Sequence, residues 1–126
     1  MKNFKIWSIT FFFVPLFLAI YFKIWISVAI LITVIISSIL YHSANEKKYA
    51  TIDNFLAWIL IFTNLYISYL GNFYMPHFSI ALIFVLLSFY FIGYGKKKYG
   101  YNLSHGIWHI CSSLITVLSI LTFRQI

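Results

Sequence analysis

Apolar runs of membrane-spanning length follow one another along almost the whole of this 126-residue chain. A helix needs about 20 apolar residues to cross the hydrocarbon core of a bilayer. Hydrophobic residues make up 63% of the chain and charged residues only 9%, whereas a soluble domain carries roughly a quarter charged residues. A soluble domain of this size could not bury so much apolar surface. The sequence therefore predicts an integral membrane protein in which residues 1–126 form one transmembrane domain.

The breaks between the apolar runs predict an all-α transmembrane bundle of about five spans. We expect these spans at residues 4–21, 24–42, 52–70, 77–94 and 103–123. Segments this long and this uniformly apolar favour helices over the alternating strands of a membrane barrel. Pro15 is expected to bend the first span. That span resembles a signal peptide, but it lacks a small-residue cleavage site, so we expect it to be retained.

Lysine and arginine residues predict the orientation of the bundle. Cytoplasmic loops of membrane proteins carry an excess of these residues. With five spans, seven basic residues fall on the side of the N-terminus and two on the other side: Lys2, Lys5, Lys47, Lys48, Lys96, Lys97 and Lys98 against Lys23 and Arg124. This distribution predicts a cytoplasmic N-terminus and an external C-terminus. Because topology accounts for the net charge of +7, we expect no nucleic-acid partner.

Polar residues that are unusual in membrane spans gather at the predicted cytoplasmic ends of three helices. His42 ends the second span, and Ser38 lies one turn deeper on the same helix face. Asp53 opens the third span, and His105 and His109 occupy the first two turns of the fifth. Ionisable residues within membrane spans are costly and usually functional. We therefore predict one shared site for these five residues.

Three histidines at one depth indicate a zinc site. His105 and His109 are four residues apart, so both can bind one ion from a single helix face, and His42 would supply a third ligand. Three protein ligands leave the fourth tetrahedral position to water, which is the arrangement of catalytic zinc sites. Zinc lowers the pKa of such a water to about 7. Asp53 would orient this water or accept its proton, and Ser38 would hydrogen-bond the water or a substrate carbonyl.

The remaining polar candidates receive structural interpretations. A single histidine near a helix end is most often an interfacial or packed residue, and His77, which falls near the outer side, is assigned no role. Glu46 is expected to be a solvated loop residue. Cys111 is the only cysteine, which excludes a disulfide within the chain, and we expect it to be a packing residue.

The site motifs resemble the signature of the CREST superfamily. Residues 38–42 read S-x-x-x-H, Asp53 follows, and residues 105–109 read H-x-x-x-H. This superfamily includes alkaline ceramidases, the adiponectin- and progestin-receptor family, lipid-remodelling proteins of GPI-anchor processing, and myomaker-like proteins. The resemblance implies that His42, His105 and His109 bind zinc, and that Asp53 and Ser38 surround the zinc-bound water. The spacing from His42 to Asp53 is closest to the ceramidase branch.

The family has seven spans, whereas this chain is predicted to have five. Two helices that would wall the substrate cavity would then be absent, and association into a homo-oligomer could supply the missing wall. Removing two spans, an even number, does not change the direction in which the last span runs relative to the second, so the site can still form.

Three functions are compatible with these residues. The leading hypothesis is an intramembrane zinc-dependent hydrolase that cleaves a lipid amide or ester, as a ceramidase does, with a membrane lipid as its substrate. The second is a non-catalytic protein with structural zinc, such as a receptor-like, myomaker-like or assembly component. The third is a transporter or channel subunit whose histidines relay protons or metal. Frequent Ile, Lys, Asn and Phe residues are typical of an AT-rich bacterium, so we expect an inner-membrane location with the site near the cytoplasmic face.

Overall fold

All of the regular structure in the described residues is helical. The computed structural model describes residues 4–44 and 47–125, and no strand occurs within these ranges. The prediction of an all-α chain is thus confirmed for this part of the sequence. The elements, in chain order, are α1 (Phe4–Trp7), the 3₁₀ segment η1 (Ser8–Phe12), α2 (Phe13–Tyr21), α3 (Trp25–Ala44), α4 (Lys47–Leu70), α5 (His77–Tyr90), the π-helical segment η2 (Phe91–Gly95), α6 (Lys96–Tyr99) and α7 (Tyr101–Arg124).

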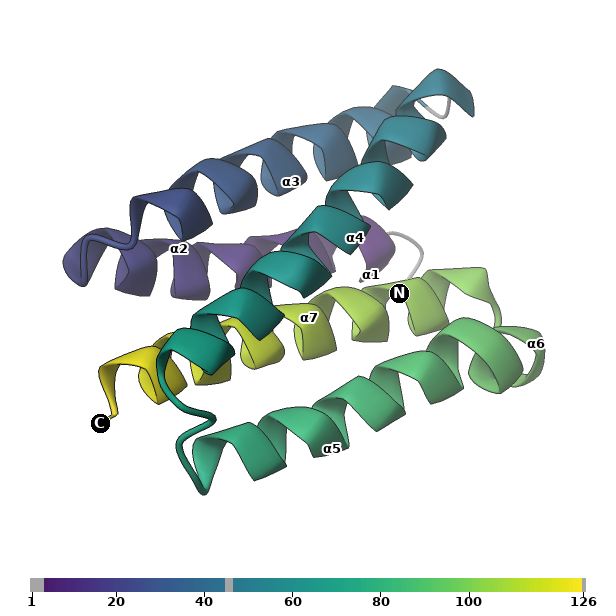
Figure 1. Cartoon of the computed structure of the whole chain (residues 1–126). Coiled ribbons are helices and arrows are strands. Elements are labelled where there is room, and N and C mark those ends of the chain that lie inside the picture. Colours follow the sequence, from purple (N-terminus) through teal and green to yellow (C-terminus); the bar gives the residue numbers. More distant parts are fainter. Residues whose placement is uncertain (1–3, 45–46, 126) are drawn as a thin grey trace.

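The helix α7 occupies the centre of the bundle (Figure 1). The elements α1, η1 and α2 follow one another as a single N-terminal rod, and α7 contacts all three of them as well as α4 and α5. In contrast, α3 packs against α4 and the N-terminal rod. Successive rods run in opposite directions, so α1, the start of α4 and the start of α7 lie at one end of the bundle, while α5 begins at the other (Figure 1).

The N-terminal rod changes its helical geometry directly before Pro15. The backbone follows a 3₁₀ helix from Ser8 to Phe12 and an α-helix from Phe13 onward. Proline has no N–H to bond the carbonyl four residues earlier, and its ring clashes with that carbonyl. A tighter turn ahead of the proline is one way to relieve this conflict. The irregularity thus lies ahead of Pro15, in a 3₁₀ segment that includes buried Ser8 and Phe12. The bend expected at Pro15 itself stays a prediction.

The bundle buries small polar side chains and exposes large apolar ones. Thr116 and Thr122 of α7 are fully buried, whereas Ile83 and Leu86 of α5 are 63% and 71% exposed. Helices that associate in lipid gain little from burying leucine, because lipid tails are equally apolar, so their interfaces favour small residues and interhelical hydrogen bonds. The buried serine and threonine side chains of this bundle fit that rule, and they lie beside an apolar core that includes Phe12, Leu31 and Ile120.

Among the side chains that the structure describes, two hydrogen bonds join the buried faces of α4 and α7. Asn64 Nδ2 donates to Thr116 Oγ1 at 3.0 Å, and Ser68 Oγ donates to Ser119 Oγ at 3.3 Å. In each pair one residue belongs to α4 and the other to α7, and the pairs follow one another along both helices. They therefore help to set the register of α4 against the central helix.

Within residues 4–44 and 47–125, two helices are long and apolar enough to cross a membrane, namely His77–Gly95 and Asn102–Arg124. Three further apolar helices are shorter, at Ser8–Tyr21, Trp25–Tyr41 and Phe55–Leu70. These five segments fall within the five predicted runs or within a few residues of them. A total of five spans, and their orientation, stay predictions.

Candidate metal centre

The rings of His105 and His109 are in contact near the start of α7. Their centroids are 4.5 Å apart and their planes meet at 81°. His109 is buried at 3% exposure, and His105 is half-buried. Residues four apart on a helix are neighbours, so the spacing alone puts both imidazoles on one face. A zinc ion bonds histidine nitrogen at about 2.0–2.1 Å, and rings this close can each present a nitrogen to the same ion.

Ser38 of α3 lines the same cavity as His109. The Ser38 side chain is 2% exposed. A serine hydroxyl can both donate and accept hydrogen bonds, so this position can serve a water molecule or a carbonyl inside the cavity. The structure therefore puts His105 and His109 in contact and places Ser38 along the cavity that His109 lines.

The side chains of His42 and Asp53 lie outside the described residues. The backbone of α3 includes His42 and that of α4 includes Asp53. The last turn of α3 and the first turn of α4 lie at the end of the bundle where α7 begins (Figure 1). Among the side chains that are described, no three His, Cys, Asp or Glu residues form a group that could hold a metal ion. Because the expected ligand set includes His42, that set stays a prediction.

Ser8 contacts His109, and no sequence pattern pointed to it. Ser8 Oγ lies 2.8 Å from His109 Nδ1 in a buried hydrogen bond between residues 101 positions apart. The ring of Phe12 packs edge-on against the same imidazole, with centroids 5.7 Å apart. A serine in an apolar span tends to face a neighbouring helix. This tendency indicates that Ser8 faces another helix, but the chain holds many such serines, and only the tertiary structure shows that this one meets a histidine.

Phe4 fills the space above Gly106, which lies between the two histidines in the sequence. A Cβ atom added to Gly106 would overlap Cδ1 and Cε1 of the Phe4 ring and lie 3.1 Å from its Cγ. Phe4, Ser8 and Phe12 are each four residues apart, and all three meet the histidine-bearing part of α7. The N-terminal rod therefore covers this segment of α7 with a stripe in which Ser8 is the polar member.

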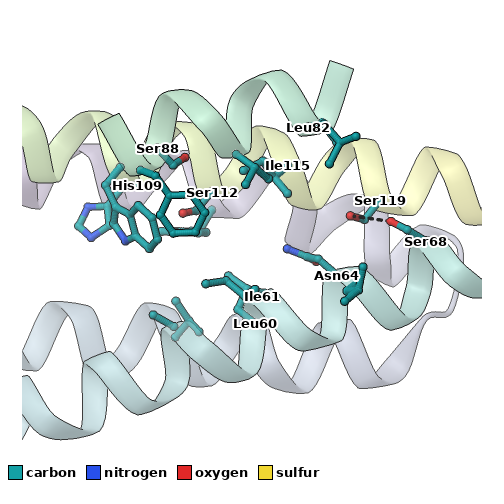
Figure 2. Close-up of a pocket in the computed structure, with 18 of the residues that line it drawn as sticks. Leu60, Ile61, Asn64, Ser68, Leu82, Ser88, His109, Ser112, Ile115 and Ser119 are labelled. Carbon is teal, nitrogen blue, oxygen red and sulfur yellow. Dashed lines mark hydrogen bonds between the residues drawn. The ribbon is translucent and has the colours of Figure 1, made fainter. Parts of the chain in front are cut away.

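The cavity next to His109 has a volume of about 260 Å³. Residues of η1, α3, α4, α5 and α7 line it, and most of the lining is apolar, as at Leu60, Ile61 and Ile115. Figure 2 shows polar side chains at both ends, with His109, Ser88 and Ser112 at one end and Asn64, Ser68 and Ser119 at the other.

This volume is slightly below the roughly 300–1,000 Å³ of pockets that hold drug-sized ligands. From His109 to Ser119, both of which line the cavity, α7 rises by about 15 Å at 1.5 Å per residue. The cavity is therefore elongated along α7.

The chemistry of the described donors fits zinc. Histidines that bind a metal commonly donate their other ring N–H to an oxygen atom, which sets the tautomer and the ring orientation. Ser8 Oγ is placed to accept such a bond from His109 Nδ1, and Nε2 is then the nitrogen that can bind a metal. The adjacent imidazole of His105 supplies a second nitrogen of the same kind.

Comparisons with protein-family models, with curated proteins and with solved structures give no match to this chain. The resemblance to the CREST superfamily thus depends on residues 38–53 and 104–109, and membership stays a prediction.

Proposed function

We propose that this chain is a five-span membrane protein that binds zinc through His42, His105 and His109 and hydrolyses a lipid amide or ester. The observation that carries this proposal is the contact between His105 and His109 beside an apolar cavity that Ser38 also lines. The proposed location is a bacterial inner membrane, with the site near the cytoplasmic face.

The outer surface of the bundle supports insertion into a membrane. Soluble monomers rarely expose contiguous apolar patches larger than a few hundred Å². Here Trp58 and Phe62 of α4 are 56% and 63% exposed one turn apart, and the outward residues of α5 are similarly apolar. Contact between these faces and lipid tails costs no free energy, whereas their exposure to water is unfavourable.

The cavity supports an acyl chain as the bound part of the substrate. Its lining is mainly hydrocarbon, and polar side chains gather near its ends. A single chain would match an elongated space of about 260 Å³, whereas a two-tailed lipid would leave its second tail in the bilayer. A carbonyl at the head of the bound chain would then lie near Ser38 and His109.

The proposed chemistry divides between the metal and the side chains around it. Zinc supplies Lewis-acid activation of water and of a carbonyl. The three histidines would hold the ion, and the Ser38 hydroxyl would donate a hydrogen bond to the substrate carbonyl oxygen. Asp53 would accept a proton from the attacking water and deliver it to the leaving amine or alcohol as the carbonyl–nitrogen or carbonyl–oxygen bond breaks. Water is added across that bond, so a fatty acid and an amine or alcohol are released.

Asp53→Asn tests this function most cheaply. The purified chain in liposomes would be incubated with ceramide, another N-acyl lipid and a phospholipid, and released fatty acid would be measured by mass spectrometry. We expect turnover by the wild type and a loss of about 10²–10⁴-fold in Asp53→Asn, the usual contribution of general acid–base catalysis. The zinc content of the variant should be unchanged. A wild type that cleaves none of these lipids would refute the hydrolase proposal.

A structural role for zinc is the second candidate, and the packing of His109 favours it. The imidazole is held by Ser8 and Phe12 of the N-terminal rod, so an ion on His109 would link that rod to α7 and, through His42, to α3. Structural metal binding is coupled to folding. Removal of zinc should then lower the thermal unfolding temperature sharply, whereas a purely catalytic ion should leave the helices intact.

A further inference from the structure

We propose that Ser8 is a positioning residue that holds His109 in the tautomer and orientation required to bind a metal. This inference rests on the proposed zinc site. The carrying observation is the buried 2.8 Å contact between Ser8 Oγ and His109 Nδ1. Both side chains are almost completely enclosed, at 1% and 3% exposure, so water cannot readily replace either partner.

The chemistry of imidazole gives this contact its consequence. A neutral histidine carries one N–H donor and one bare nitrogen acceptor, and a metal binds only the bare nitrogen. When Nδ1–H of His109 donates to Ser8 Oγ, the lone pair of Nε2 is available to the metal. Without the hydroxyl, the buried Nδ1–H would lose this acceptor, and the alternative tautomer, which protonates Nε2, would compete with metal binding.

The surrounding packing keeps Ser8 in place. Phe4 lies against Gly106 one turn before Ser8, and Phe12 packs edge-on against the imidazole of His109 one turn after it. The contact is thus formed where two aromatic side chains clamp the N-terminal rod to α7. The 3₁₀ segment begins at Ser8 itself, so the tighter helical geometry starts at the residue that meets the histidine.

Zinc affinity, measured by competition with a chromogenic chelator on the purified full chain, tests the role of Ser8. Loss of an oxygen partner behind a metal-binding histidine weakens binding by about 10- to 100-fold, and we expect a loss of this size for Ser8→Ala. Ser27→Ala is the matched control, because Ser27 is also 1% exposed but lies on α3. We expect its affinity to equal that of the wild type.

A second pair of variants covers the case in which Ser8→Ala does not fold. Ser8→Thr and Ser8→Val have nearly the same volume and differ mainly in the hydroxyl group. Ser8→Thr should retain most of the zinc affinity, and the affinity of Ser8→Val should fall as far as that of Ser8→Ala. Equal affinities in Thr and Val, or an unchanged affinity in Ser8→Ala, would overturn the role of Ser8 while leaving the zinc site in place.

The measurements distinguish a failure of the proposed hydrolase function from a failure of the proposed role of Ser8. A wild type that binds zinc but cleaves no lipid would remove the hydrolase proposal and leave the role of Ser8 standing, because the readout is affinity rather than turnover. A wild type that binds no zinc would remove both.

Discussion

The contact between Gly106 and Phe4 allows a quantitative test of the packing of the N-terminal rod against residues 105–109 of α7. Gly106→Ala adds one methyl group where the Phe4 ring already lies. The obstacle is a side chain rather than backbone, so the ring can move aside, but only by loosening the rod that carries Ser8. The substitution should therefore affect both stability and the Ser8–His109 contact.

Two opposing effects set the magnitude for Gly106→Ala. Alanine in a helix interior is about 0.8–1.0 kcal/mol more favourable than glycine. Inserting a methyl group into a packed contact costs about 1–3 kcal/mol. The net effect should be a loss of about 0–2 kcal/mol in the free energy of unfolding. When Phe4→Ala removes the obstacle, only the helix-propensity gain remains. The coupling between positions 4 and 106 should then be about 1–3 kcal/mol, the size of the packing penalty.

A double-mutant cycle measures this coupling. The free energy of unfolding of the wild type, both single variants and the double variant would be determined in detergent micelles by circular dichroism. Gly93→Ala is the control, because a Cβ at Gly93 meets no atom within 4 Å, and it should not couple to Phe4→Ala. Coupling between Phe4 and Gly106 below about 0.5 kcal/mol, the level seen for independent sites, would refute the packing of the N-terminal rod against this part of α7.

Two further predictions concern the contact between α4 and α7. In Gly71→Ala the new Cβ would lie 2.7 Å from Phe123 Cα and from the carbonyl carbon of Thr122. Because these backbone atoms cannot rotate away, the free energy of unfolding should fall by about 3 kcal/mol, clearly more than for Gly106→Ala in the same unfolding assay. Asn64→Leu removes the hydrogen bond to Thr116, but Thr116 Oγ1 still donates to a backbone carbonyl. The free energy of unfolding should therefore fall by only about 1 kcal/mol, and a fall above about 3 kcal/mol would show that this hydrogen bond contributes more than a single bond should.

Much of the fold can be predicted from the sequence because hydropathy is a local signal. The apolar runs locate the helices, and the spacing of His105 and His109 places their rings on one face before any tertiary structure is known. Pro15 marks an irregularity in the first span, but not its form, which is a 3₁₀ segment at Ser8–Phe12. The sequence has no periodicity that predicts such a segment.

The contacts made by the N-terminal rod could not be predicted in the same way. Ser8 and His109 are 101 residues apart, and Phe4 meets Gly106 over a similar separation. Such pairs depend on which helix lies beside α7, and hydropathy is the same for every arrangement of apolar helices. Ser27 and Ser38 are also buried serines in apolar spans, so residue type alone could not single out Ser8 as the neighbour of a histidine.

The zinc content of the purified protein decides whether the histidines form one zinc site. Inductively coupled plasma mass spectrometry would be applied to gently purified wild type and to His105→Ala, both at known protein concentration. We expect about one zinc per chain in the wild type, the occupancy of a single mononuclear site, and its loss in the variant. Absence of metal from the wild type, together with a failure to take up added zinc, would exclude the zinc site and leave the contact between His105 and His109 as a packing feature of α7.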